Sequence, residues 1–202
     1  INVLGAGAPS RNEDGSRTDD PIRPGEYGWV SLFEGETRRG WEGSVPGDWK
    51  VLDGHLVGRT GDLLNRWCWA DFEAHVEFKG TGGLLFRVGS DQTGHIGFEQ
   101  PGYRFDLGSG ELSTADGRLL AKADSGWSAD EWHVLALAAR EGTFNVSVDG
   151  EPALASSDTT SPLKGRIGFV VDGEQLRVKS VRARPLDLED LQNIPADNYY
   201  CY

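Results

Sequence analysis

The sequence predicts an all-β protein in which two antiparallel sheets pack face to face. In residues 72–78, FEAHVEF, every second side chain is apolar and the side chains between them are Glu or His. A period of two places the apolar residues on one face of a strand, whereas a helix would scatter them. Asp-Gly pairs that begin at positions 53, 116, 149 and 172 each stand between two strand-like segments. Such pairs are typical of hairpin turns, so the topology is expected to meander.

The first half of the chain contains seven expected strands. Two of them flank Asp53-Gly54 within residues 49–58, and the others cover residues 29–33, 72–78, 84–88, 95–98 and 103–107. Glycines at positions 80, 82 and 83 separate the strand at 72–78 from the strand at 84–88. In residues 84–88, LLFRV, the only charge is Arg87. Alternation places Arg87 on the face opposite Phe86 and Val88.

The second half supplies the remaining strands. Residues 111–122 indicate a polar hairpin on the rim of a concave face, and the apolar run at 132–139, WHVLALAA, indicates a strand covered on both faces. Residues 144–148, 167–171 and 176–181 alternate again, and the odd step between Val178 and Val181 predicts a β-bulge. The total of about a dozen strands is enough for two packed sheets.

The strand-rich middle, residues 29–186, is the predicted sandwich domain, and the two flanking segments differ from it. Residues 1–28 are polar and interrupted by Gly and Pro, so we expect an extended arm that is ordered by lying on this domain or on a partner. Residues 187–202 continue a short apolar helix that Pro195 ends, and they finish on the aromatic run YYCY. This tail either packs back on the sandwich or docks onto a partner.

Composition excludes several kinds of partner. The 202 residues suffice for one domain with a sizeable core. The net charge of −12 repels nucleic acid and anionic lipid, which leaves neutral sugars, cations and proteins. No run approaches the ~18 apolar residues that a membrane span needs. The chain lacks Met and begins at Ile1, so either a leader was removed or the sequence starts downstream of the true N-terminus. We expect an extracytoplasmic location, periplasmic or at the cell surface.

The two cysteines, Cys68 and Cys201, leave two arrangements open. A single disulfide would pin the tail to the sandwich. Alternatively, Cys68 is buried between Trp67 and Trp69 and Cys201 is a free thiol. Two cysteines alone give no framework pattern that decides between them.

Eight segments together resemble a known bacterial family. They are WKVLDGHLVGR (49–59), LLNRWCWADFEAHVEFK (63–79), GGLLFRV (82–88), GYRFDL (102–107), EWHVLAL (131–137), VSVDGEP (146–152), GRIGFVV (165–171) and LRVKSVRARPL (176–186). Their order and spacing are similar to those of the 3-keto-disaccharide hydrolase domain. The resemblance covers residues 29–186 and implies a concanavalin A-like jelly roll of the lectin and glucanase type.

The resemblance also implies an activity and a set of site residues. Removal of the acidic proton beside the ketone of a 3-keto-glycoside needs a base and a group that polarises the carbonyl. Arg87 matches the arginine that ends the family's Gly-(apolar)3-Arg strand, and Tyr103 lies in its Gly-Tyr-Glu-x-Gln strand. Arg104 stands where the family has that Glu, and Asp106 stands where it has that Gln. Two glycines replace the Asn-Ser pair that precedes the first of these strands.

The polar residues around this second strand are the candidate site. His95, Glu99, Arg104 and Asp106 can converge on one face of the sheet, where His95, Tyr103 and Arg104 would contact a ligand. The candidate catalytic residues are Arg87, Glu99 and Asp106. The alternative is an ordinary salt-bridged sheet surface, in which each pair contributes little.

Other residue pairs carry a weaker signal. Trp67 and Trp69, two residues apart, share a strand face that either stacks on a sugar or fills the core. Glu73 and Glu77 also share a face, and we expect them to be solvated partners in a charge ladder rather than a glycosidase acid and base. The four histidines lack the paired spacing of zinc ligands, so no metal or other cofactor is predicted.

Two classes of function stay open, and the sequence leads us to prefer the first. The first is a non-catalytic accessory or structural subunit of a larger extracytoplasmic assembly, held through the arm and the tail. A membrane-bound bioenergetic complex, respiratory or photosynthetic, would be such an assembly. The second is a 3-keto-glycoside hydrolase or lyase, or a carbohydrate-binding module. The changed polar strand favours the first class, whereas the family resemblance and the Trp pair favour the second.

Overall fold

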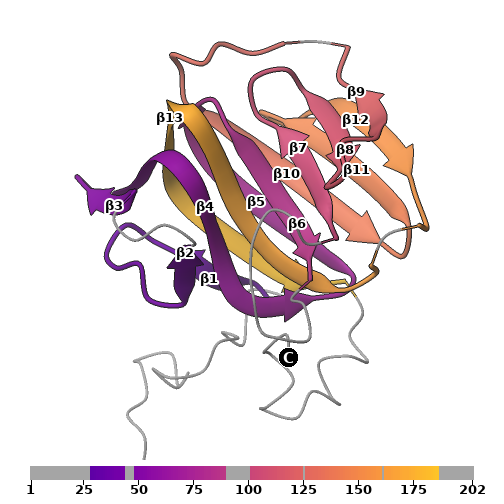
Figure 1. Cartoon of the computed structure of the whole chain (residues 1–202), viewed down its shortest axis with the longest axis horizontal. Coiled ribbons are helices and arrows are strands. Elements are labelled where there is room, and N and C mark those ends of the chain that lie inside the picture. The colour runs from indigo at the N-terminus through magenta and orange to yellow at the C-terminus, as the bar shows by residue number, and fades with distance from the viewer. Residues whose placement is uncertain (1–27, 44–47, 90–100, 125, 161, 187–202) are drawn as a thin grey trace, which may run out of the picture.

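The predicted antiparallel sandwich is confirmed. A computed structural model describes residues 28–43, 48–89, 101–124, 126–160 and 162–186. Within them, thirteen strands form the fold drawn in Figure 1. No helix long enough and apolar enough to cross a membrane occurs in these ranges. The expected arm, the expected tail with its helix, and the expected strand at residues 95–98 lie outside the described residues.

The strands divide into two facing sheets. The first contains, in spatial order, β12 (Glu151–Ser157), β11 (Thr143–Val148), β10 (His133–Arg140), β5 (Phe72–Gly80), the second half of β13 (Gly165–Pro185) and β1 (Val30–Phe33). The second contains β9 (Leu119–Lys122), β8 (Glu111–Thr114), β7 (Tyr103–Asp106), β6 (Gly83–Val88), the first half of β13 and β4 (His55–Trp69), with β2 (Trp41–Gly43) and β3 (Trp49–Leu52) paired to β4. In Figure 1 the strands β6, β7 and β8 lie in front of β10 and β11.

Strand β13 connects the two sheets. Its first half pairs with β6 and its second half with β5, while β4 follows it along much of its length. The sequence predicts a hairpin at Asp172-Gly173, and this prediction is wrong. The strand continues through both residues, and the extra residues are absorbed by a register shift between Asp172 and Leu176. The bulge predicted between Val178 and Val181 is confirmed, because the pairing with β5 shifts between Val178 and Ser180.

Alternation explains most of the core. The apolar residues of β5, β7, β11 and β13 that share a face are buried between the sheets. Aromatic side chains meet across the interior, where the Phe144 ring lies 5.3 Å from Phe86 and 4.5 Å from Tyr103. The expectation that residues 132–139 are covered on both faces is wrong. Val134 is 44% exposed on the outer face, and the following outward positions are alanines.

A bulge changes the position of Arg87. The register between β13 and β6 shifts at this point, and Arg87 adopts a φ of 51°. Val88 therefore joins Leu85 on the outer face instead of following Phe86 inward. A Cβ at Gly165 would clash with the backbone of Arg87, so only glycine fits opposite the bulge. The expected orientation of Arg87, opposite both Phe86 and Val88, is thus wrong.

His133 makes the stability of the fold depend on pH. Its Nδ1 lies 2.7 Å from Asp149 and its Nε2 lies 2.8 Å from the carbonyl of Ser128. Burial alone would lower the pKa of His133, but the hydrogen bonds to Asp149 and Ser128 outweigh it and raise that pKa. A raised folded-state pKa stabilises the protein fully below the ordinary value near 6.5, and this stabilisation is lost as the pH rises through the folded value.

We therefore expect the free energy of unfolding to fall as the pH rises above about 6.5, and to fall less in a His133→Gln variant. Urea unfolding at several pH values measures both slopes. Equal slopes in the two proteins would contradict the assignment to His133.

Candidate functional site

The candidate site is the outer face of the second sheet, which we call the Arg104 face. Because side chains alternate, the residues next to core positions on β4, β13, β6 and β7 point away from the core. Strand pairing arranges them in two neighbouring rows, one of Leu64, Gly168, Leu85 and Arg104 and the other of Asp62, Val170, Gly83 and Asp106. Leu64, Leu85 and Val88 form a small buried apolar cluster within this face, and Val170 packs against it.

Arg104 and Asp106 form the exposed polar part of this face. Their side chains are 31% and 29% exposed, and Nη2 of Arg104 lies 2.9 Å from Oδ2 of Asp106. The other carboxylate oxygen of Asp106 accepts hydrogen bonds from the backbone N–H groups of Gly108 and Ser109. Asp106 is therefore fixed by the turn that follows β7, and it orients Arg104. A Cβ at Gly83 would lie 2.7 Å from Nε of Arg104. The Arg104 side chain can therefore lie over position 83 because this residue is glycine.

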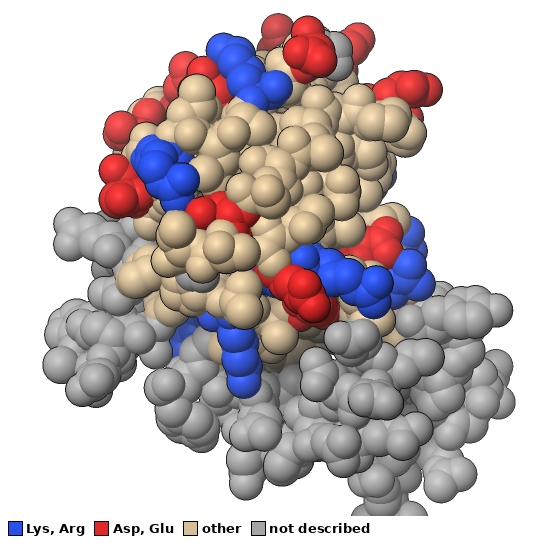
Figure 2. Space-filling view, turned by 90° about the vertical axis from the view of Figure 1, so that its right-hand side faces the viewer, with Lys and Arg blue, Asp and Glu red and all other residues tan. Residues whose placement is uncertain are grey.

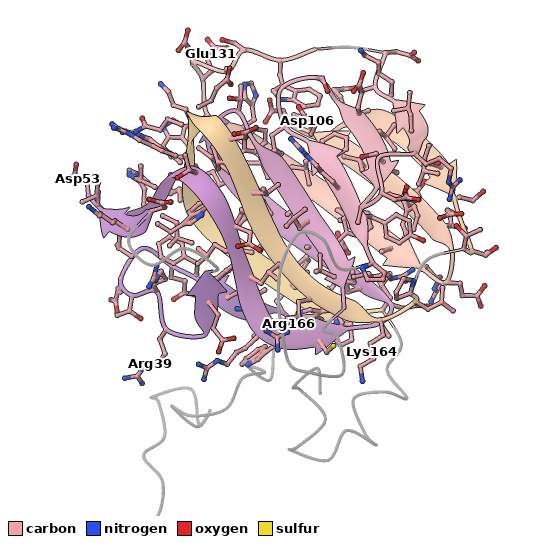
Figure 3. All side chains as sticks on the ribbon, in the orientation of Figure 1. Arg39, Asp53, Asp106, Glu131, Lys164 and Arg166 are labelled. Carbon is pink, nitrogen blue, oxygen red and sulfur yellow. The ribbon has the colours of Figure 1, made fainter. Side chains whose placement is uncertain are left out.

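A second polar group lies across the apolar cluster. Glu42 on β2 accepts ion pairs from Arg66 at 3.1 Å and from Arg166 at 3.4 Å. Arg166 and Asp62 are both nearly buried. Figure 3 shows Arg166 and Asp106 toward opposite ends of this face. The face thus offers charged groups on both sides of an apolar centre.

Two of the predicted site residues point into the protein instead. Tyr103 is buried, stacks on Phe86 at 5.2 Å, and donates a hydrogen bond to Asp158 at 3.2 Å. Arg87 is fully buried and binds the carbonyl groups of Ala70 and Glu141. The structure therefore does not bring these two residues together with Arg104 and Asp106, because β7 alternates and β6 is bulged.

The tryptophan pair occupies the inner face of β4. Trp67 and Trp69 do share a face, with ring centroids 6.4 Å apart. Trp69 is nearly buried and packs on Phe72, while Trp67 is half-buried against the core. In this arrangement the pair fills the core, and neither ring belongs to the Arg104 face.

The remaining predicted positions fall partly outside the described residues. His95, Glu99 and Cys201 lie there. Cys68 is disulfide-bonded, and it pairs in register with Arg166 at one end of the Arg104 face. Within the described ranges, no three His, Cys, Asp or Glu side chains gather as metal ligands would.

The carboxylates of β5 form the expected charge ladder. Glu73 lies opposite Arg184 and receives two hydrogen bonds from it at 2.6 and 2.9 Å, and Glu77 pairs with Lys179 at 2.7 Å. Burial alone would raise the pKa of Glu73, but the hydrogen bonds from Arg184 and His75 lower it. A carboxyl group with a lowered pKa is ionised at neutral pH and is a poor general acid.

Sequence reasoning missed several residues of the Arg104 face. Asp62 lies between the expected strands at 49–58 and 72–78, Arg166 lies just before the expected strand at 167–171, and Glu42 lies in the expected loop around Trp41. The sequence signal that could have identified them is a charged residue at a position that faces away from the core. Which strands are neighbours could not be known, because it depends on the path of β13 between the sheets.

Charge is unevenly distributed over the surface. Figure 2 shows the side of the molecule that lies at the right of Figure 1, where acidic side chains with some basic ones among them lie along the upper rim, a mixed charged group lies at the lower right, and much of the middle is uncharged. A neutral ligand is compatible with such a surface, whereas a polyanion is repelled by it.

Known structures share this fold. A candidate glycosyl hydrolase from Parabacteroides distasonis is 18% identical with a TM-score of 0.65, covering 83% of this chain and 100% of that one. The carbohydrate-binding module CBM66 from Bacillus subtilis is 18% identical with a TM-score of 0.60, covering 72% and 95%. A β-1,3-1,4-glucanase from a mouse hindgut metagenome is 10% identical with a TM-score of 0.58, covering 79% and 100%. At these identities the likeness concerns the fold.

The sequence itself carries the family relationship. No curated protein sequence matches the chain significantly. Residues 28–184, which include all thirteen strands except the last residue of β13, match the 3-keto-alpha-glucoside-1,2-lyase-like domain. This match confirms the resemblance inferred from the order and spacing of the strands. The chain belongs to the family of 3-keto-alpha-glucoside-1,2-lyase-like domains.

Proposed function

We propose that this protein binds a carbohydrate on the Arg104 face. The observation that carries the proposal is the Arg104–Asp106 pair, which is about one-third exposed and points outward from the sheet of a domain whose family is named for a sugar substrate. A guanidinium fixed by a carboxylate donates hydrogen bonds in a defined direction, as recognition of sugar hydroxyl oxygens requires. Leu64, Leu85 and Val88 are buried, so half-buried Val170, which pairs with Gly83, supplies the apolar surface beside the pair.

Binding is favoured over glycoside hydrolysis by the spacing of the carboxylates. Asp62 and Asp106 stand in one row but three strands apart, which separates their Cα atoms by about 14 Å. Glycosidases need two carboxyl groups about 5–9.5 Å apart, one of them protonated. Glu42 and Asp62 are closer, being diagonal neighbours on β2 and β4, but Glu42 is neutralised by Arg66 and Arg166.

Isothermal titration with the α-glucosides sucrose and trehalose, and with 3-keto-sucrose, tests the proposal. We expect Arg104→Gln to weaken binding at the Arg104 face at least tenfold, since hydrogen bonds to charged groups contribute about 1.5–3 kcal/mol. Arg59→Gln is the matched control, because Arg59 is exposed on β4 outside this face. Unchanged affinity in Arg104→Gln would refute the proposed site.

The same probes separate binding from catalysis. A lyase or hydrolase would release the aglycone from 3-keto-sucrose, which mass spectrometry detects. Turnover that is lost in Arg104→Gln and in Asp106→Asn would make the protein an enzyme of its family. We expect binding without turnover.

The proposal of an accessory subunit in an extracytoplasmic assembly stands beside this one. Its support is that Arg87 and Tyr103, which match the family's polar strands, are buried and committed to internal hydrogen bonds. A protein of this kind would reach a membrane-bound respiratory or photosynthetic complex through its terminal segments, in the periplasm or at the cell surface. Purification from the native source in mild detergent tests it. Migration as a 22.0 kDa monomer would refute it.

A further inference from the structure

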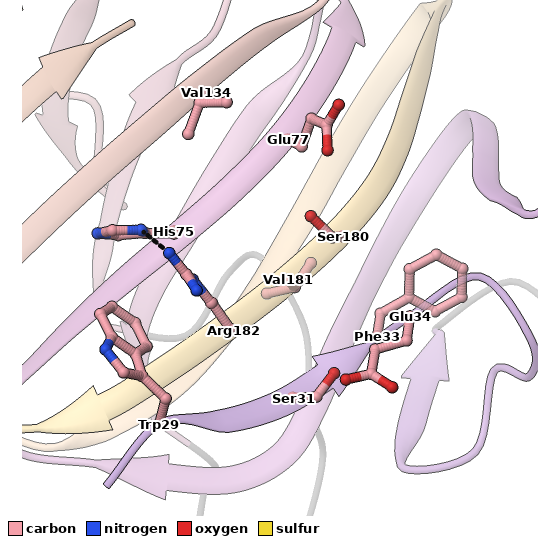
Figure 4. Close-up of a pocket in the computed structure, with 10 residues that line it drawn as sticks. All are labelled: Trp29, Ser31, Phe33, Glu34, His75, Glu77, Val134, Ser180, Val181 and Arg182. Atoms are coloured by element: carbon pink, nitrogen blue, oxygen red, sulfur yellow. Dashed lines mark hydrogen bonds between the residues drawn. The ribbon is translucent and has the colours of Figure 1, made fainter. Parts of the chain in front are cut away.

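A pocket lies on the outer face of the first sheet, on the side of the molecule opposite the Arg104 face. It has a volume of about 450 Å³ and lies over β1, β5 and the second half of β13. Figure 4 shows its lining, which includes Trp29, Ser31, Glu34, Ser180 and Arg182. We call it the Trp29 pocket. Its volume falls in the range of about 300–1,000 Å³ that small-molecule sites occupy.

Two irregularities of strand pairing shape this pocket. The pairing of β1 with β13 shifts between Ser31 and Phe33, and the pairing of β13 with β5 shifts between Val178 and Ser180. Bulges bend a strand and turn its side chains in a new direction, and they are common beside functional sites. An unbroken sheet would present a flat face here.

The pocket contains one cation and one anion that no ion pair with another described residue neutralises. Lys179 neutralises Glu77, and Arg184 neutralises Glu73. Arg182, by contrast, forms no ion pair in the described part of the chain and donates to Nδ1 of His75 at 3.0 Å. Exposed Glu34 likewise has no cationic partner among the described side chains. Figure 4 shows the Arg182 guanidinium and the Glu34 carboxylate on opposite sides of the pocket.

An ordered aromatic ring borders the cation. The guanidinium carbons of Arg182 and Arg184 lie 4.7 and 4.9 Å from the Trp29 ring, and the His75 ring lies 4.5 Å from it. These contacts fix Trp29 at the edge of the pocket. Val134, exposed on β10, adds apolar surface at the opposite edge.

We propose that the Trp29 pocket is a second saccharide site, which binds one neutral hexose unit. A hydroxyl group both donates and accepts, so hydroxyls on opposite sides of a sugar ring can pair with the Arg182 donors and the Glu34 acceptor, and Ser31 and Ser180 add further partners. The two opposite charges sum to zero, which matches a neutral ligand better than an acidic one. The indole edge and Val134 cover apolar C–H groups of the ring.

The two sites lie on opposite outer faces of the sandwich, so one molecule would hold two sugar units at once. This inference shares its ligand class with the proposed function but uses none of the same residues. A protein with two such sites can bridge two chains of a glycan or bind one polymer with avidity.

Titration of the full chain with trehalose and sucrose tests the inference. We expect two binding sites per molecule. Arg182→Gln and Glu34→Gln should each lower the affinity of the same site, the Trp29 pocket, at least tenfold, whereas Arg59→Gln should lower the affinity of neither site. Ser180→Trp, which fills the pocket but retains Arg182, should remove the same site.

In nuclear magnetic resonance spectra, sugar should shift the indole N–H signal of Trp29, which is assigned with Trp29→Phe. Matching thermal melting curves confirm that the variants fold.

The outcomes distinguish the two proposals. A single site lost in Arg104→Gln and retained in Arg182→Gln overturns the inference and keeps the proposed function. A single site that is lost in Arg182→Gln and retained in Arg104→Gln supports the saccharide site in the Trp29 pocket and overturns the proposed site on the Arg104 face. Absence of any binding to either sugar overturns both.

Discussion

Replacing Arg87 with alanine is expected to lower the free energy of unfolding by about 3–5 kcal/mol. The guanidinium is fully buried and donates to the carbonyl of Ala70 at 3.1 Å, to Asp71 at 3.1 Å and to the carbonyl of Glu141. It thereby joins the turn between β4 and β5 to the turn between β10 and β11, and it lies 5.6 Å from the Phe144 ring. Alanine would remove this donor from the carbonyl groups of Ala70 and Glu141, and it would leave the Asp71 carboxylate with the backbone N–H of Glu141.

Burial lowers the pKa of Arg87, and Asp71 opposes that effect, so the guanidinium remains charged at any working pH. Urea unfolding of Arg87→Ala measures the change, with Arg59→Ala as the exposed control. If the free energy of unfolding falls by less than about 1 kcal/mol and sugar binding is lost, Arg87 is a ligand-binding residue and not a structural one.

The second large effect is expected for Asp158→Ala, a loss of about 2–3 kcal/mol. Asp158 is nearly buried and binds the hydroxyl of Tyr103, the backbone N–H of Thr160 and the guanidinium of Arg118. Its removal leaves the buried Tyr103 hydroxyl with a weaker set of partners. Asp124→Ala, at an exposed position, is the control.

Asp158 also contributes to the acid limit of stability. Burial alone would raise its pKa, but hydrogen bonds from Thr160 and Arg118 lower it. A lowered folded-state pKa gives stability that is present above the ordinary value near 3.9 and is lost as the pH falls through the folded value. Asp158→Ala should therefore destabilise the protein strongly at pH 6 and weakly at pH 2. An equal loss at both values would contradict the ionised network.

The strands were predictable because their cause is local. The alternating residues 72–78 form β5. The Asp-Gly pairs at 53, 116 and 149 form tight turns between neighbouring strands. The Asp172-Gly173 pair carries the same local signal, yet strand β13 continues through it with a shift in register. Pairing with β4 on both sides of the pair decides this, and such pairing is a long-range property.

The candidate site was less predictable for a related reason. The outward direction of Arg104 and Asp106 follows from alternation in β7, and it is observed. The inward turn of Arg87 follows from a bulge that no residue type announces, apart from the glycine opposite at position 165. The Trp29 pocket joins residues 29–34 to residues 180–182, which are adjacent only after the sheet has formed.

A crystal structure of the protein soaked with trehalose or 3-keto-sucrose tests the central claim most directly. The account predicts a sugar on the Arg104 face, with hydroxyl oxygens within hydrogen-bonding distance of the Arg104 guanidinium and with Asp106 still bound to the turn at Gly108. A sugar bound elsewhere, with the Arg104–Asp106 pair untouched, would contradict it.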